Sequence, residues 1–189
     1  MIQKILEKKK EFEKGLSERN RRLWEVFMFL VRFTILAAPV YFLLWQNWNP
    51  VWLRTVNAKI SSSVLNLLRV ETSQLQTFIE TNTFTVDVST DSTGWKSFIA
   101  LTALILSVRG EKIRKKIYGI VLGTALVFLG NIVRLVSMMY MVEKLGIPYE
   151  LIHKFLWRWG LTFLVLIAWL VWLNWEDVRK KVEQTHLYS

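Results

Sequence analysis

The sequence contains no cysteine and only two histidines among its 189 residues. The lack of cysteine excludes disulfide bonds and metal sites built on thiolates, and no metal or other cofactor is expected. Acidic residues are also scarce, 15 against 25 lysines and arginines, which gives a net charge of +10. A charge of this sign is common in nucleic-acid-binding proteins, but no nucleic-acid-reading motif accompanies it. We therefore expect no nucleic-acid partner.

Hydrophobic residues make up 52% of the chain and fall in runs that basic blocks flank. This pattern is typical of a polytopic membrane protein, and it predicts an all-α fold with about four transmembrane helices. The expected spans are residues 24–45, 98–108, 117–142 and 159–175. The apolar part of the second span is short, so residues 93–96 are expected inside or near the headgroup layer.

Two further elements are expected on the outer side of the membrane. Residues 50–70 have one apolar helical face, which predicts an amphipathic helix on the outer surface or packed over the bundle. Residues 84–89 alternate between polar and apolar side chains and predict a strand. Its expected partner is the segment 76–80, with Thr81-Asn82 as the turn of a small β-hairpin that rests on the helices.

The basic blocks set the expected orientation. Four spans place the N-terminal block, the 109–116 loop and the C-terminal block together in the cytoplasm, as the positive-inside rule requires. A fifth crossing at 50–70 would move the 109–116 loop outside. The chain is therefore expected in the cell membrane with both termini cytoplasmic.

Three regions are expected along the chain. They are a basic amphipathic N-terminal segment (1–23), a membrane-embedded domain (24–175) and a cytoplasmic tail (176–189). The first region fits either a helix on an anionic membrane surface or a solvated tail. Arg32 lies inside the first span and is costly in lipid, so it should face protein or extend to the inner interface. A structural role is favoured for it over a catalytic one.

Three polar groups far apart in the sequence are expected at one membrane level. Ser92 and Thr93 lie at the outer end of the second span, and His153 lies in the outer segment before the fourth. Arg134 lies 18 residues into the third span, which enters from the inside. That is about 27 Å of helix, close to the outer boundary of a core about 30 Å thick.

These groups fit an acyl transfer site. Ser92 precedes a helix N-terminus, whose N–H groups and dipole favour an oxyanion and an anionic nucleophile. His153 would serve as general base or acid, and Arg134 would hold the substrate carbonyl or the developing charge. Simpler roles stay open. Ser92 and its neighbours are good helix N-caps, a lone histidine in a loop is usually structural, and Arg134 near a headgroup would extend toward it.

The residues around Ser92 resemble a known family. Asp91-Ser92-Thr93-Gly94-Trp95-Lys96-Ser97 is similar to the active-site stretch of archaeosortases and exosortases, which reads Cys-(Thr/Ser)-Gly with a following Ser. Asn131-Ile132-Val133-Arg134 resembles the Asn-x-x-Arg motif of that family, and His153 stands where its downstream histidine is expected. The form of the first motif looks more archaeal than bacterial. The resemblance covers about residues 76–175.

The resemblance implies a membrane cysteine transpeptidase that acts outside the cell. Its substrates would be surface proteins with a C-terminal sorting tail, and the new C-terminus would pass to a lipid or another acceptor. The resemblance implies Ser92, Arg134 and His153 as catalytic residues. It implies substrate-binding or supporting roles for the remaining motif residues, Asp91, Thr93, Gly94, Trp95, Lys96, Ser97 and Asn131.

One departure from the family pattern is clear. Ser92 stands where the family has its nucleophilic cysteine, and a serine hydroxyl is a far weaker acid that needs an adjacent base. An engineered inactivating substitution is the favoured interpretation. A natural serine enzyme and a pseudoenzyme stay open, as do two functions without catalysis, a membrane carrier and a protein that binds membrane-protein tails.

Overall fold

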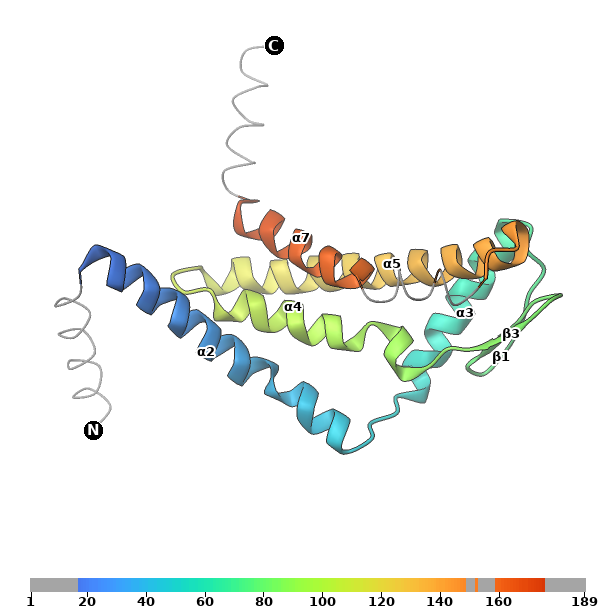
Figure 1. Cartoon of the computed structure of the whole chain (residues 1–189), viewed down its shortest axis with the longest axis horizontal. Helices are drawn as coiled ribbons and strands as arrows, with labels where there is room; N and C mark the ends of the chain where they lie inside the picture. The colour runs from blue at the N-terminus through green and yellow to red at the C-terminus, as the bar shows by residue number, and fades with distance from the viewer. Residues whose placement is uncertain (1–16, 149–151, 153–158, 176–189) are drawn as a thin grey trace, which may run out of the picture.

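The computed structural model describes residues 17–148, 152 and 159–175, and within them the chain is mostly helical, as the sequence predicts (Figure 1). The elements keep the labels of Figure 1. In chain order they are α2 (Glu18–Trp45), α3 (Val51–Leu67), β1 (Ser73–Leu75), β2 (Phe78–Glu80), β3 (Thr85–Asp87), the 3-10 helix η1 (Thr90–Thr93), α4 (Trp95–Ser107), α5 (Ile113–Leu145) and α7 (Leu161–Leu173).

Among the described residues, two helices are long and apolar enough to cross a membrane. They are α2, with 28 residues, and α5, with 33 residues. At 1.5 Å per residue these helices are about 42 and 50 Å long, more than the hydrocarbon core of about 30 Å. The helices α4 and α7 are apolar but have 13 residues each, which is about 20 Å. These helices are consistent with a helical membrane protein, and the count of four spans stays a prediction.

Much of the surface of the helix α2 is apolar and exposed. It contains no buried residue, and Val26, Ile35 and Phe42 are each more than half exposed. Such a surface would be unfavourable in water and suits contact with lipid. The helix begins at Glu18, six residues before the expected span, because the Ser17 hydroxyl caps it by accepting the N–H of Asn20 at 3.4 Å. It packs against α4 (Figure 1).

Small residues bring α5 and α7 together. A Cβ added at Gly119 would lie 2.2 Å from the indole Nε1 of Trp172, and one at Gly130 would lie 2.2 Å from a methyl carbon of Leu164. Glycines at these two positions therefore allow the close helix contact that is common in membrane bundles. Behind this contact, Leu101 of α4 and other apolar side chains of the three helices form a buried cluster.

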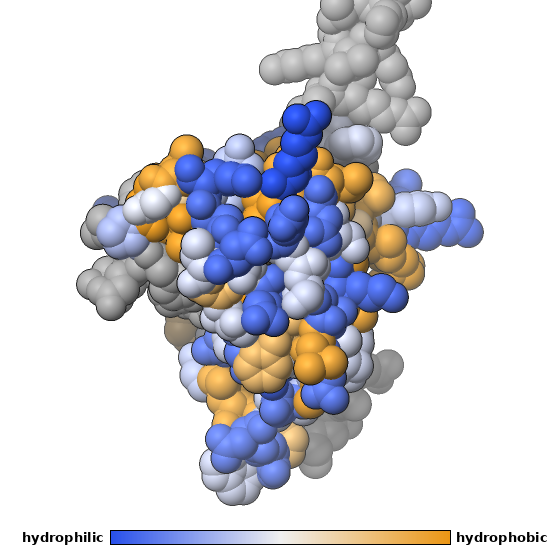
Figure 2. Space-filling view, turned by 90° about the vertical axis from the view of Figure 1, so that its right-hand side faces the viewer, coloured by the Kyte–Doolittle hydropathy of each residue, from blue (hydrophilic) through white to orange (hydrophobic). Residues whose placement is uncertain are grey.

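The other end of the molecule combines α3, a sheet and the last turns of α5. The sheet is antiparallel in the order β1-β2-β3 and pairs Ile79 with both Gln74 and Val86. It differs from the expected two-stranded hairpin because Gln76, assigned above to a strand, has φ +54° and lies in the turn between β1 and β2. Figure 2 views this end and shows mostly hydrophilic side chains, with hydrophobic patches between them.

A polar contact joins the sheet to α5. The hydroxyl of Thr83, in the loop between β2 and β3, donates to the carboxylate of Glu143. The pKa of Glu143 lies below its ordinary value, mainly because this hydrogen bond stabilises the charged carboxylate. The contact fixes the sheet relative to the helix that carries Arg134.

The basic loop between α4 and α5 lies at the opposite end of the bundle. Figure 1 places the turn between α4 and α5 beside the start of α2 and the end of α7, far from the sheet. A pocket there joins Glu25 of α2, Arg109 of the turn and Leu173 of α7. This arrangement agrees with an orientation in which these ends are cytoplasmic, which itself stays a prediction.

Single cysteines test the orientation, and the chain provides a cysteine-free background. We expect Asn82→Cys, in the exposed loop between β2 and β3, to react with an impermeant maleimide added to intact cells. Lys112→Cys, before α5, should react only after the cells are opened. Labelling of position 112 from outside would contradict the orientation.

Candidate active site

The segment around Ser92 forms a tight buried turn before α4. Ser92 and Thr93 are 7% and 0% exposed. The Ser92 N–H donates to the Ser89 carbonyl at 3.0 Å, and the Thr93 hydroxyl donates to the Thr90 carbonyl at 2.8 Å. Gly94 ends the turn with φ +77°, a conformation that residues with a Cβ rarely adopt. The turn therefore sets the main-chain path of Ser92 just before the helix begins.

Two side chains of α5 hold the main chain of Ser92. The Ser92 carbonyl accepts hydrogen bonds from Nδ2 of Asn131 at 2.9 Å and from Nη2 of Arg134 at 3.1 Å. The same Arg134 nitrogen donates to Oδ1 of Asn131 at 2.8 Å. Both side chains are buried, and their spacing of three residues puts them on one helical face. The structure thus brings together three residues that the sequence motifs predict as site residues.

The contact of Arg134 differs in kind from the expected one. The guanidinium donates to the backbone carbonyl of Ser92, which points toward α5. The expected partner of Arg134 was a substrate carbonyl or a developing negative charge. The Ser92 hydroxyl instead lies 2.8 Å from the hydroxyl of Ser89. In this arrangement Arg134 positions the turn. His153, the expected general base, lies outside the described residues.

Asn57 of α3 is a site residue that the sequence analysis missed. Its Oδ1 accepts a hydrogen bond from Asn131 at 2.8 Å, and its Nδ2 donates to the Leu53 carbonyl at 2.8 Å. Asn57 is completely buried, whereas Trp52 on the apolar side of the same helix is 67% exposed. The buried side of α3 is therefore mixed, and it combines small and polar side chains with Leu53 and Leu65. The available signal was a set of small and polar residues at helical spacing: Asn57, Ala58, Ser61, Ser62.

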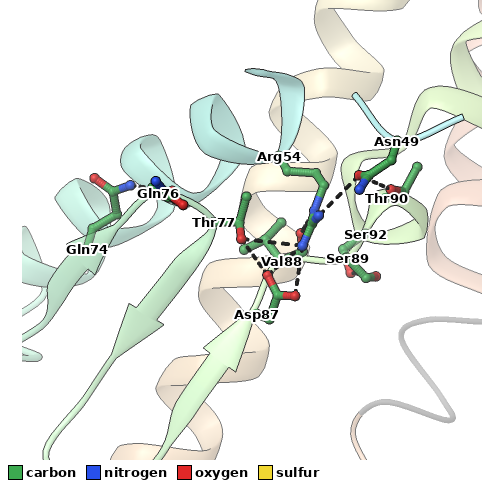
Figure 3. Close-up of polar contacts among 10 residues, drawn as sticks. All are labelled: Asn49, Arg54, Gln74, Gln76, Thr77, Asp87, Val88, Ser89, Thr90 and Ser92. Carbon is green, nitrogen blue, oxygen red and sulfur yellow. Dashed lines mark hydrogen bonds and ion pairs between the residues drawn. The ribbon is translucent and has the colours of Figure 1, made fainter. Parts of the chain in front are cut away.

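A second arginine fixes the chain just before the turn (Figure 3). Nη2 of Arg54 donates to both carboxylate oxygens of Asp87 at 2.7 and 2.8 Å, and its Nε donates to the Val88 carbonyl at 2.7 Å. Its Nη1 donates to Oδ1 of Asn49, which also accepts the hydroxyl of Thr90. Arg54 therefore joins α3, the end of β3 and the first residue of η1.

The remaining motif residues shape the start of α4. Asp91 and Lys96 form a partly exposed ion pair at 2.8 Å across the turn. Trp95 is 3% exposed and packs edge-on against Trp48 with ring centroids 5.2 Å apart. The N–H of Ser97 donates to the Gly94 carbonyl at 2.9 Å and begins the helical ladder. In the described structure these residues contact one another and the fold, and their roles toward a substrate stay predictions.

The geometry suits a nucleophile at position 92. The residue lies two positions before the N-cap of α4, where the helix dipole favours negative charge. The guanidinium of Arg134, which donates to the Ser92 carbonyl, adds a fixed positive charge next to the same residue. The helix dipole and this charge both favour an anion that develops at residue 92.

The comparisons with known proteins found one family. A family model described as transmembrane exosortase matches residues 16–173. No curated protein and no solved structure matches the chain. The matched range contains the turn of Ser92, both arginines of the site and the helices that carry them.

Asn131→Ala tests the hydrogen bonds that hold the turn. The change leaves Asn57 Oδ1 without this donor and removes one of two donors to the Ser92 carbonyl. We expect a loss of about 1–3 kcal/mol in unfolding free energy, the usual effect of breaking buried hydrogen bonds. Thermal unfolding in detergent measures it. The control is Asn174→Ala, an exposed asparagine whose loss should change stability by less than about 0.5 kcal/mol. Equal effects of the two changes would show that the network does not hold the fold.

Proposed function

Because the chain belongs to the transmembrane exosortase family, we propose that it is an inactive form of a membrane transpeptidase that sorts surface proteins by their C-terminal tails. The family suggests a cysteine transpeptidase in general and substrates that carry a C-terminal sorting signal. The observation that best supports a site at residue 92 is the pair of hydrogen bonds that Asn131 and Arg134 donate to the Ser92 carbonyl.

In the proposed reaction, the side chain at position 92 attacks the scissile carbonyl of the tail. The amide bond breaks, the nitrogen of the leaving segment takes a proton, and the upstream part stays attached as an acyl group. A lipid or another acceptor then takes this acyl group and frees position 92. With serine the first step is slow, because the hydroxyl is a weak acid and its 2.8 Å neighbour, Ser89, is not a base. The chain is therefore proposed to be an inactive form.

The site residues divide into two roles. Asn131 and Arg134 position the turn through its carbonyl, and the charge of Arg134 stabilises the oxyanion. His153 is proposed to move the proton between the nucleophile and the leaving nitrogen. Arg54 and Asn57 keep β3 and α3 in place around the turn without touching the reacting atoms.

The proposed substrate reaches the site from the membrane. Its own apolar helix would lie in the bilayer, with the cleavage motif at the outer headgroup layer and a basic cluster inside. Ser92 lies close to the end of β3, at the end of the bundle that carries the sheet, which fits cleavage at that layer (Figure 3). Tail binding without catalysis is the second candidate, and the serine at position 92 is the observation in its favour.

Restoring the nucleophile tests the proposal. We expect Ser92→Cys to cleave a membrane-anchored tail from the same organism, and we expect the Ser92 form to cleave it at least about 100-fold more slowly, since the thiol is the stronger acid. Gel mobility of a tagged substrate in coexpressing cells measures the product. Equally fast cleavage by both forms would show a natural serine enzyme. A well-folded Ser92→Cys protein without cleavage would favour tail binding.

Two further changes in the Ser92→Cys background test the partners. We expect Arg134→Ala or His153→Ala to lower the cleavage rate by about 10²–10⁴-fold, as loss of a charge stabiliser or general base does. Arg69→Ala is the matched control, because Arg69 is an exposed arginine at the same end of the fold. Full activity of either double variant would remove that residue from the mechanism.

A further inference from the structure

A cavity at the basic end of the bundle contains arginines that the proposed reaction does not use. It has a volume of about 610 Å³ and lies between α2, the end of α4 and α7. Its walls are largely apolar and include Met28, Phe29 and Leu173. Arg32 of α2 and Arg109 after α4 also line it, with Glu25 as the acidic member. The cavity thus combines apolar walls with an excess of positive charge.

Arg32 is placed to bind an anion inside this cavity. It lies in the apolar run of α2, eight residues beyond Trp24. That is about 12 Å along the helix from a residue type that marks the membrane interface. Its Nε donates to the carbonyl of Met28, one turn earlier, at 2.8 Å, which directs the guanidinium back toward the basic end. Among the residues that the structure describes, no carboxylate lies within ion-pair distance of Arg32.

We propose that this cavity binds a membrane phospholipid with a net negative headgroup. Arg32 and Arg109 would hold the phosphate, since guanidinium groups bind phosphate by paired, charge-assisted hydrogen bonds. The apolar walls would contact the upper part of an acyl chain. The proposed source of the phosphate is a lipid and not free phosphate, because the cavity lies against α2. The surface of this helix is apolar, and none of its residues is fully buried.

The bound lipid would join α2 to the rest of the bundle. Because no side chain of α2 is fully buried and the helix packs mainly against α4, a ligand held by Arg32 of α2 and by Arg109 after α4 adds a further contact between α2 and the bundle. Binding to the assembled bundle alone raises its stability through linkage. The cavity lies at the C-terminal end of α4, whereas Ser92 precedes the N-terminal end of the same helix, so the site is independent of the proposed reaction.

Native mass spectrometry of the full chain in detergent tests the site. The probes are phosphatidylglycerol, phosphatidylcholine and inorganic phosphate. We expect one phosphatidylglycerol to bind at least about tenfold more tightly than phosphatidylcholine, and we expect millimolar inorganic phosphate neither to bind nor to displace it. Equal affinity for the two lipids would overturn the proposal. Displacement by inorganic phosphate would show a phosphate site in place of a lipid site.

Matched variants locate the binding. We expect Arg32→Gln and Arg109→Gln each to weaken phosphatidylglycerol binding by about tenfold, the effect of one lost charge-assisted contact. Arg32→Lys keeps the charge and should weaken it less, which provides a folded variant if the glutamine change destabilises α2. Arg114→Gln should have little effect, because Arg114 is an exposed arginine that lines a different cavity, between α5 and α7. Equal weakening by Arg114→Gln would show only general attraction to a basic surface.

Discussion

The carbonyl oxygen of Ser92 is the point on which the rest of the site depends. One backbone oxygen accepts hydrogen bonds from Asn131 and Arg134, and Asn131 in turn donates to Asn57. Three segments far apart in the sequence, α3, the turn before α4, and α5, are therefore joined through the side-chain amide of Asn131, which donates to both Asn57 and the Ser92 carbonyl. A buried guanidinium is stable only where oxygen atoms replace its water, and this carbonyl and the Asn131 amide supply them. The Arg134 guanidinium and the turn of Ser92 therefore stabilise each other.

The rest of the outer end supports this contact from behind. Arg54 donates three hydrogen bonds to Asp87 and Val88 at the end of β3, so the chain enters η1 from a fixed position. Glu143 ties the sheet to α5 through Thr83. The helical bundle is built differently, with small residues between α5 and α7 and with no fully buried side chain in α2. The fold thus has a hydrogen-bonded end that carries the site and an apolar helical body that is suited to lipid.

Much of this arrangement follows from sequence reasoning, and some of it does not. The helical membrane fold follows from apolar runs, and the pairing of Asn131 with Arg134 follows from their spacing on one helix. The contact of Arg134 with a backbone carbonyl has no sequence signal, because any residue at position 92 would present the same oxygen. Asn57 and Arg54 were missed because their partners lie 74 and 33 residues away and helical periodicity does not report them. In α3 the apolar side includes Trp52 and Leu67, which are exposed, and Ile60 and Val64, which pack against the core, so the apolar stripe alone does not identify the buried side.

The central claim is that position 92 is the reacting group. The most direct test is the intact mass of Ser92→Cys protein, mixed with a synthetic sorting tail and quenched in acid within the first turnover. The account predicts a covalent adduct with the mass of the upstream tail segment, mapped by peptide sequencing to residue 92 and removed by hydroxylamine, as a thioester is. Cleavage of the tail with an adduct at another residue, or with none at any quench time, would contradict it.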